Sequence, residues 1–142
     1  METYRIDYST TDTPSERELV ELYDSVQWSA YTRDPARLVA AVAASLATVT
    51  ARLDGRLVGL ARVVGDGLTI IYLQDILVVP QLQRAGVGRE LLSRVLAPYQ
   101  EVRQKALMTD DEPRQRAFYE AMGFTEIRDA EHPLRVFVSF GS

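Results

Sequence analysis

The sequence contains no cysteine and one histidine, and these two shortages exclude several kinds of chemistry. Without cysteine the chain forms neither disulfides nor thiolate nucleophiles, and it has no thiolate ligands for a metal. The one histidine, His132, stands beside Pro133 in a polar turn with no nucleophile motif nearby, which argues against a Ser-His-Asp hydrolase. One histidine without cysteine also argues against a structural zinc site. We therefore expect a protein that needs no metal.

Long apolar runs and concentrated positive charge are also missing. No run reaches the roughly 18 apolar residues that a membrane span needs, and Met1–Arg5 lacks the apolar core of a signal peptide. The net charge is −4 and the basic residues are spread along the chain, whereas nucleic-acid binding needs a concentrated basic stripe. We expect a cytoplasmic protein that binds neither membrane nor nucleic acid.

What the sequence does contain is the composition of an ordinary globular domain. Of its 142 residues 46% are hydrophobic and 25% are charged. This length suits one domain, residues 1–142, and is enough to bury a core without disulfides or a structural metal.

Hydrophobic periodicity predicts the order of the elements. The predicted strands are 2–8, 48–53, 56–64, 68–79, 106–109, 124–127 and 136–140, and the predicted helices are 14–25, one starting at Asp34-Pro35, 87–103 and 113–122. This order predicts a mixed α/β (α+β) domain. We expect a central, mostly antiparallel sheet of about six to seven strands, with a parallel pairing in the middle and helices on both faces.

Several local signals make these predictions specific. Thr13-Pro14-Ser15-Glu16 has the pattern of a helix start with Thr13 as the cap. Asp54-Gly55 between two apolar runs predicts a hairpin, and Gly123 is placed to end a helix. The run from Leu68 to Val79 is apolar apart from Gln74 and Asp75, which predicts a strand buried on both faces.

The segment after that strand has the character of an anion site. It runs from Asp75 through Pro80 to Arg89, with glycines at 86 and 88 before the predicted helix. Free N–H groups at a helix N-terminus, glycines that admit close approach, and nearby arginines suit a pyrophosphate. The segment is neither a dinucleotide fingerprint, since Leu91 stands at the third glycine, nor a Walker A loop. The alternative is that the glycines only shape a loop and the arginines are solvated.

Two motifs resemble the GNAT superfamily. Gln83-Arg84-Ala85-Gly86-Val87-Gly88 matches the Q/R-x-x-G-x-G/A hallmark that follows a strand ending in Val-x-Pro. Phe118-Tyr119, followed by Gly123-Phe124, matches a second hallmark about thirty residues later. The two motifs stand in the family's order, and the order of the elements agrees over almost the whole chain.

The resemblance implies how acetyl-CoA is held. The backbone amides of the loop would bind the CoA pyrophosphate, and the strand backbone would pair with the pantetheine arm. One strand amide would also polarise the thioester carbonyl. The implied cofactor-binding residues are Ile76, Leu77, Val78, Gln83, Arg84, Ala85, Gly86, Val87, Gly88 and Arg89.

The resemblance also implies catalytic groups. Tyr119 matches the family's general acid, which protonates the leaving thiolate; the alternative is a tyrosine that packs a helix. Asp75 is the candidate general base, because a carboxylate inside an apolar strand is costly unless it has a partner or a role. The alternatives are a structural Asp75, a substrate anchor, or deprotonation through water or a backbone carbonyl. No metal is implied.

Trp28 and Tyr31 match a region that often forms one wall of the family's acceptor pocket, and the alternative for Trp28 is a core anchor. Glu112 departs from the family, since many members carry an asparagine seven residues before the tyrosine.

The function implied is an N-acetyltransferase that transfers acetyl from acetyl-CoA to a small-molecule or protein amine by direct attack in a ternary complex. Alternatives are a non-catalytic acyl-CoA-sensing module and an interaction domain that retains only the fold. C-terminal strands in the family often build dimers, so a homodimer is also an expectation.

Overall fold

The computed structural model describes residues 4–141. Its contacts divide the chain into two compact units between Met108 and Thr109. We describe each unit by itself.

The first unit is built on a five-stranded sheet. Its strands are β1 (Asp7–Ser9), β2 (Ala47–Leu53), β3 (Arg56–Gly65), β4 (Ile70–Val78) and β5 (Gln104–Leu107), and they lie in sequence order. All neighbours pair antiparallel except β4 and β5, which are parallel. The mixed, mostly antiparallel sheet is confirmed, as is the Asp54-Gly55 hairpin. The parallel pair was predicted in the middle of the sheet, but in residues 4–141 it lies at the edge, because β5 is the last strand. Five strands form in residues 4–141, fewer than the six to seven predicted.

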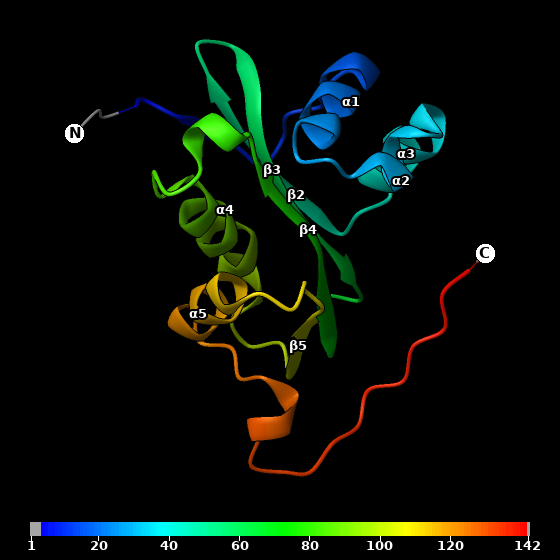
Figure 1. Cartoon of the computed structure of the whole chain (residues 1–142), viewed down its shortest axis with the longest axis vertical. Helices are drawn as coiled ribbons and strands as arrows, with labels where there is room; N and C mark the ends of the chain where they lie inside the picture. Colours follow the sequence, from blue (N-terminus) through cyan, green and yellow to red (C-terminus); the bar gives the residue numbers. More distant parts are fainter. Residues whose placement is uncertain (1–3, 142) are drawn as a thin grey trace. The chain divides into compact units, whose positions relative to one another are not determined.

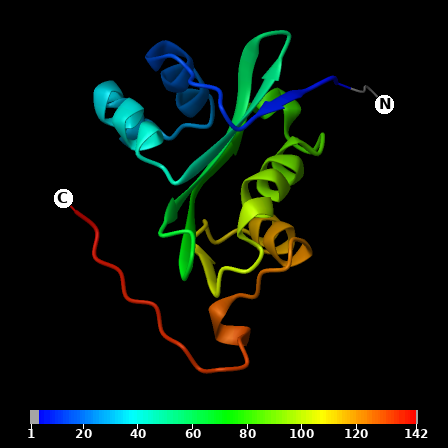
Figure 2. The same ribbon diagram turned by 180° about the vertical axis from the view of Figure 1, so that it is seen from behind.

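Helices cover both faces of this sheet, as predicted. Helices α1 (Glu16–Ser25), α2 (Ser29–Thr32) and α3 (Pro35–Ala43) lie on one side, and α4 (Val87–Leu96) lies on the other (Figure 1; Figure 2 shows the opposite view). Leu19, Leu22 and Leu38 fill the first interface, and Leu91, Leu92 and Val95 fill the second. The short α2 was not predicted.

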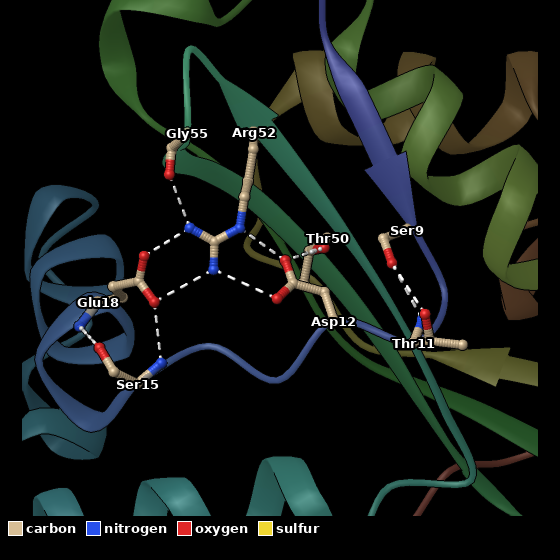
Figure 3. Close-up of polar contacts among 8 residues, drawn as sticks. All are labelled: Ser9, Thr11, Asp12, Ser15, Glu18, Thr50, Arg52 and Gly55. Atoms are coloured by element: carbon tan, nitrogen blue, oxygen red, sulfur yellow. Dashed lines mark hydrogen bonds and ion pairs between the residues drawn. The ribbon is translucent and has the colours of Figure 1, made fainter.

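The first helix starts later than predicted. Its N-cap is Ser15, whose hydroxyl accepts from the Glu18 N–H at 3.1 Å while the Glu18 carboxylate accepts from the Ser15 N–H at 2.9 Å. This reciprocal capping box satisfies two helix-end donors, so Thr13 is not the cap. Arg52 on β2 then binds both Glu18 and Asp12, which fixes the start of α1 to the sheet (Figure 3).

The fourth helix is shorter than the predicted 87–103. It ends at Leu96 and continues as a single 3-10 turn, Ala97–Tyr99. Pro98 explains the difference, because proline has no N–H to donate and its ring clashes with the carbonyl four residues earlier.

A β-bulge divides β4. Arg62 pairs with Asp75, but the next residue of β3, Val63, pairs with Leu73, so Gln74 is the extra residue. The strand is not buried on both faces as predicted: Ile71, Leu73 and Asp75 are buried, whereas Gln74 is exposed.

The second unit consists of α5 (Pro113–Ala121), a 3-10 turn (Ile127–Asp129) and an extended segment to residue 141. Gly123, at φ 94°, follows the last helical residues as expected of a helix-ending glycine. The predicted strands 124–127 and 136–140 do not form. Phe124 donates its N–H to Tyr119 O, and Arg116 binds Glu126 and Asp129. Residues 124–127 therefore bind to α5 and do not pair as a strand. Residues 133–141 form neither helix nor strand.

Candidate active site

The loop between β4 and α4 presents free backbone donors. Helix α4 begins at Val87, and its first intrahelical bond runs from Glu90 N–H to Gly86 O at 3.1 Å. The N–H groups of residues 86–89 therefore have no intrahelical acceptor. They coincide with the positive end of the helix dipole, an arrangement that suits an anion.

The backbone of this loop is left-handed at two points. Arg84 has φ 71° and Gly86 has φ 88°. A Cβ built on Gly86 meets no atom within 4 Å, so the space above the loop is open. Arg84, Ala85 and Arg89 are exposed around it, whereas Val87 is buried and Gly88 half-buried.

An open strand edge leads to this loop. The strand β4 pairs with β5 only from Ile70 to Leu73, so Gln74–Val78 has a partner strand on the β3 side alone in the described part of the chain. Val79 N–H donates to Val58 O, and the antiparallel alternation then turns the N–H and C=O of Ile76 and Val78 toward the open edge. The backbone of Leu77 faces β3 instead.

Gln83 connects the loop to this edge. Its Nε2 donates to Val78 O at 3.1 Å. One outward carbonyl is therefore already bound, and the outward groups of Ile76 and the N–H of Val78 remain available to an added chain.

Asp75 is the centre of a buried polar cluster. Its side chain is 2% exposed. Its Oδ2 accepts from Arg62 Nε at 2.6 Å and from the Tyr23 hydroxyl at 2.8 Å, and its Oδ1 accepts from the Tyr31 hydroxyl at 2.7 Å. Arg62 also reaches Ala41 O and Ser45 Oγ on the α3 side. Each buried charge thus has its partner, which the low dielectric of the interior requires.

The phenols of this cluster stay protonated. Burial raises the pKa of Tyr23, and the neighbouring Asp75 carboxylate raises it further. Burial also raises the pKa of Tyr31; the Gln74 amide opposes this rise and Asp75 adds to it. Both hydroxyls therefore act as donors to Asp75 over the physiological range.

Three aromatic rings pack beside the carboxylate. Tyr23 and Tyr31 meet edge-on with ring centroids 5.0 Å apart, and Trp28 lies 5.9 Å from Tyr23 and 6.1 Å from Tyr31. Tyr23 is buried, whereas Trp28 and Tyr31 are half-buried. The structure thus brings together Asp75, Tyr31 and Trp28 from the predicted set.

Arg62, Tyr23 and Gln74 were not predicted as parts of the site. Arg62 carries a signal that could have found it, because a charged residue inside the apolar run 57–64 needs a buried partner just as Asp75 does. Tyr23 has the pattern of an ordinary core residue, and the bulge that places Gln74 has no local signature.

Tyr119 lies in the second unit. Its ring packs edge-on against Phe118 at 5.0 Å and Phe124 at 6.1 Å. Burial raises the pKa of its hydroxyl to about 12. Glu112 is the N-cap of α5, but its side chain makes no capping hydrogen bond.

No group of three or more potential metal ligands gathers anywhere in residues 4–141. None of the helices formed by these residues has the length and apolar character that a membrane crossing requires.

Comparison with known proteins agrees with this geometry. A sequence model described as acetyltransferase (GNAT) domain matches residues 12–133. Serotonin N-acetyltransferase 2, chloroplastic, from Oryza sativa subsp. japonica is 34% identical over 76 residues, which cover 54% of this chain and 38% of the rice protein.

Solved structures share the fold. A GNAT-family acetyltransferase from Streptococcus pneumoniae TIGR4 is 27% identical, with a TM-score of 0.82, covering 95% of this chain and 98% of its own. The aminoglycoside N-acetyltransferase AAC(6')-Iy, solved with a CoA bisubstrate analogue, is 20% identical, with a TM-score of 0.66 and coverage of 97% and 99%. The loop, the open strand edge and the match over residues 12–133 together place the chain in the GNAT acetyltransferase family.

Proposed function

We propose that this protein is an acetyl-CoA-dependent N-acetyltransferase that transfers acetyl to a primary amine by direct attack within a ternary complex. The observation that carries the proposal is the presence of free backbone groups at two sites joined by one loop, the open edge at Ile76 and Val78 and the amides of residues 86–89. A pantetheine arm can add to such an edge as an extra strand, and a pyrophosphate suits the amides at its end.

The residues around these free backbone groups also suit CoA. Space is open above Gly86, and the exposed Arg84 and Arg89 add positive charge beside it. Gln83 fixes the Val78 carbonyl and so acts as a positioning residue between strand and loop. The rice relative acetylates serotonin by its name, and AAC(6')-Iy was solved with a CoA–aminoglycoside bisubstrate analogue, which supports an amine acceptor.

In the proposed reaction the neutral amine nitrogen attacks the thioester carbonyl carbon. The N–C bond forms, the C–S bond breaks, and the thiolate takes the hydroxyl proton of Tyr119, which solvent then restores. An outward N–H of Ile76 or Val78 would stabilise the oxyanion of the tetrahedral intermediate.

The proton lost by the amine goes to water. Three donors already occupy the Asp75 carboxylate, so we assign Asp75 a positioning role, which it exerts through Tyr31. Trp28 and Tyr31 would form the wall that holds the acceptor.

The family match spans both compact units, which supports one functional domain over residues 1–142. We also propose a homodimer, because the segment 134–140 exposes five large apolar side chains: Leu134, Val136, Phe137, Val138 and Phe140.

Calorimetric titration with acetyl-CoA tests the cofactor site. Saturable binding is expected for the wild type, and Gly86→Glu should abolish it by placing a carboxylate where the pyrophosphate is proposed to bind. Gly55→Glu is the matched control, because Gly55 also has a positive φ of 81° with nothing near its Cβ.

A screen of amines for thiol release then tests turnover. Binding without release in the presence of any amine would favour the acyl-CoA-sensing module. Failure to bind acetyl-CoA or longer acyl-CoAs would overturn the proposal.

A further inference from the structure

The bulge in β4 places two consecutive side chains on the same face of the sheet. Asp75 faces α1–α3, where it meets Tyr23 and Tyr31, and Gln74 also reaches this side, since its Nε2 lies 2.9 Å from the Tyr31 hydroxyl. In a regular strand the two would point to opposite faces. The hydroxyl of Tyr31 therefore lies between a buried carboxylate and an exposed carboxamide.

Counting protons fixes the direction of each hydrogen bond. A carboxylate only accepts, so the one proton of the Tyr31 hydroxyl goes to Asp75. The same hydroxyl must then accept from Gln74, which orients the amide NH₂ toward Tyr31. The Gln74 Oε1 and the second lone pair of the Tyr31 oxygen remain as acceptors.

These two hydrogen-bond acceptors lie where the amine substrate is needed. The pairing of β4 with β5 ends at Leu73, so Gln74 is the first residue of the open edge along which we propose that the cofactor arm binds. A group held by Gln74 and Tyr31 is therefore next to the thioester end of that arm, the end opposite the pyrophosphate.

The surroundings favour a flat apolar group over a polycation. Trp28 and Tyr31 offer half-exposed rings. The buried Asp75 charge is neutralised by Arg62, so the polar cluster beside the rings offers no free carboxylate to a cation. Polyamines and aminoglycosides carry several ammonium groups and would need several free carboxylates.

We propose that Gln74 and Tyr31 determine acceptor specificity by accepting N–H groups of a primary monoamine whose aromatic part lies on the rings of Trp28 and Tyr31. This inference rests on the proposed function and narrows its acceptor to the class of arylalkylamines.

Steady-state kinetics at saturating acetyl-CoA test the proposal, with tryptamine, spermidine and glucosamine as acceptors. We expect kcat/KM for tryptamine to exceed the other two at least about tenfold. Gln74→Leu and Tyr31→Phe should each raise the KM for tryptamine about five- to tenfold through loss of a hydrogen bond. Their kcat should change far less, and calorimetry should give an unchanged Kd for acetyl-CoA.

Matched controls separate this effect from general damage. Gln104→Leu changes another exposed strand glutamine, and Tyr8→Phe removes another half-buried tyrosine hydroxyl. Neither should alter the KM. Because Tyr31→Phe also removes a donor to the buried Asp75, Gln74→Leu decides the outcome if the tyrosine variant folds poorly.

Two results would overturn the inference while sparing the proposed function: efficient acetylation of spermidine or glucosamine in preference to tryptamine, or an unchanged KM in Gln74→Leu. Acetyl-CoA binding without acetylation of any amine would overturn both.

Discussion

At the scale of one residue, removal of the Tyr119 hydroxyl tests the proposed general acid. Tyr119→Phe keeps the ring that packs against Phe118 and Phe124 and removes only the proposed acid. We expect kcat to fall about 100-fold, the usual contribution of a general acid, while calorimetry gives an unchanged Kd for acetyl-CoA. Tyr99→Phe is the control. A kcat within about twofold of wild type would exclude Tyr119 as the acid.

The pKa of Tyr119 makes a separate prediction for the pH profile. Burial raises this pKa to about 12, and the acid acts in its protonated form, which persists below that value. The kcat should therefore show no alkaline fall that depends on Tyr119 up to about pH 10, where an ordinary phenol would be half ionised. Measurement of kcat from pH 6 to 10 in wild type and Tyr119→Phe checks this. An alkaline fall near pH 9 that is absent from the variant would contradict it.

The carboxylate of Glu18 is expected to stabilise the folded protein. The hydrogen bond from Arg52, followed by that from the Ser15 N–H, lowers the pKa of Glu18 to about 2. A depressed folded-state pKa contributes stability above the unfolded value of about 4.3, and this contribution is lost as pH falls toward 2. Glu18→Gln should therefore lower the Tm at pH 7 by about 3 °C, the effect of losing roughly 1 kcal/mol from the ion pair with Arg52, because glutamine can still complete the capping box.

The difference in Tm between Glu18→Gln and wild type should shrink as pH falls from 4 to 2. Thermal unfolding followed by circular dichroism measures it. Glu16→Gln is the control, because Glu16 lies in the same helical turn outside the capping box. A difference in Tm that stays constant with pH would show that the charge of Glu18 is not the stabilising feature.

At the scale of elements, the close approach of α4 to β3 depends on Gly59. A Cβ at this position would lie 3.0 Å from Leu91 Cδ1 and 3.2 Å from Leu77 O. Gly59→Val should therefore lower the free energy of unfolding by about 1–3 kcal/mol, the usual cost of overpacking, as measured by urea denaturation. In Leu91→Ala the extra volume has room, so the same substitution should cost clearly less. Equal costs in both backgrounds would show that the helix does not constrain this position.

Elements with a strong local signal were predictable from sequence, and those that depend on distant partners were not. The Asp54-Gly55 hairpin and the glycine loop carry their own turn chemistry, so their place was predictable. The start of α1 was misplaced because Thr13 and Ser15 both resemble caps, and only Glu18 decides between them. The alternation at 136–140 predicts a strand, but a strand also needs a partner strand.

The candidate site divides in the same way. Gly86 and Tyr119 could be proposed from sequence because a motif marks each of them, and Asp75 because it is a carboxylate inside an apolar run. The cluster around Asp75 could not, since it depends on the register of β3 with β4, which brings Arg62 opposite Asp75 and leaves Gln74 as the bulge. Sequence spacing alone does not reveal where a register shifts.

For the molecule as a whole, the last prediction concerns dimer formation through the apolar segment 134–140. Phe137 is 87% exposed and Phe140 is 79% exposed, and each such side chain would gain about 1.5–3 kcal/mol from full burial. A second copy that covers the segment would realise part of this gain, so the wild type should sediment as a dimer. The double variant Phe137→Ser, Phe140→Ser should shift toward the monomer at the same concentration. Leu68→Ser is the control, because Leu68 is also 79% exposed but lies in the turn before β4. A wild type that stays monomeric at high concentration would contradict the dimer.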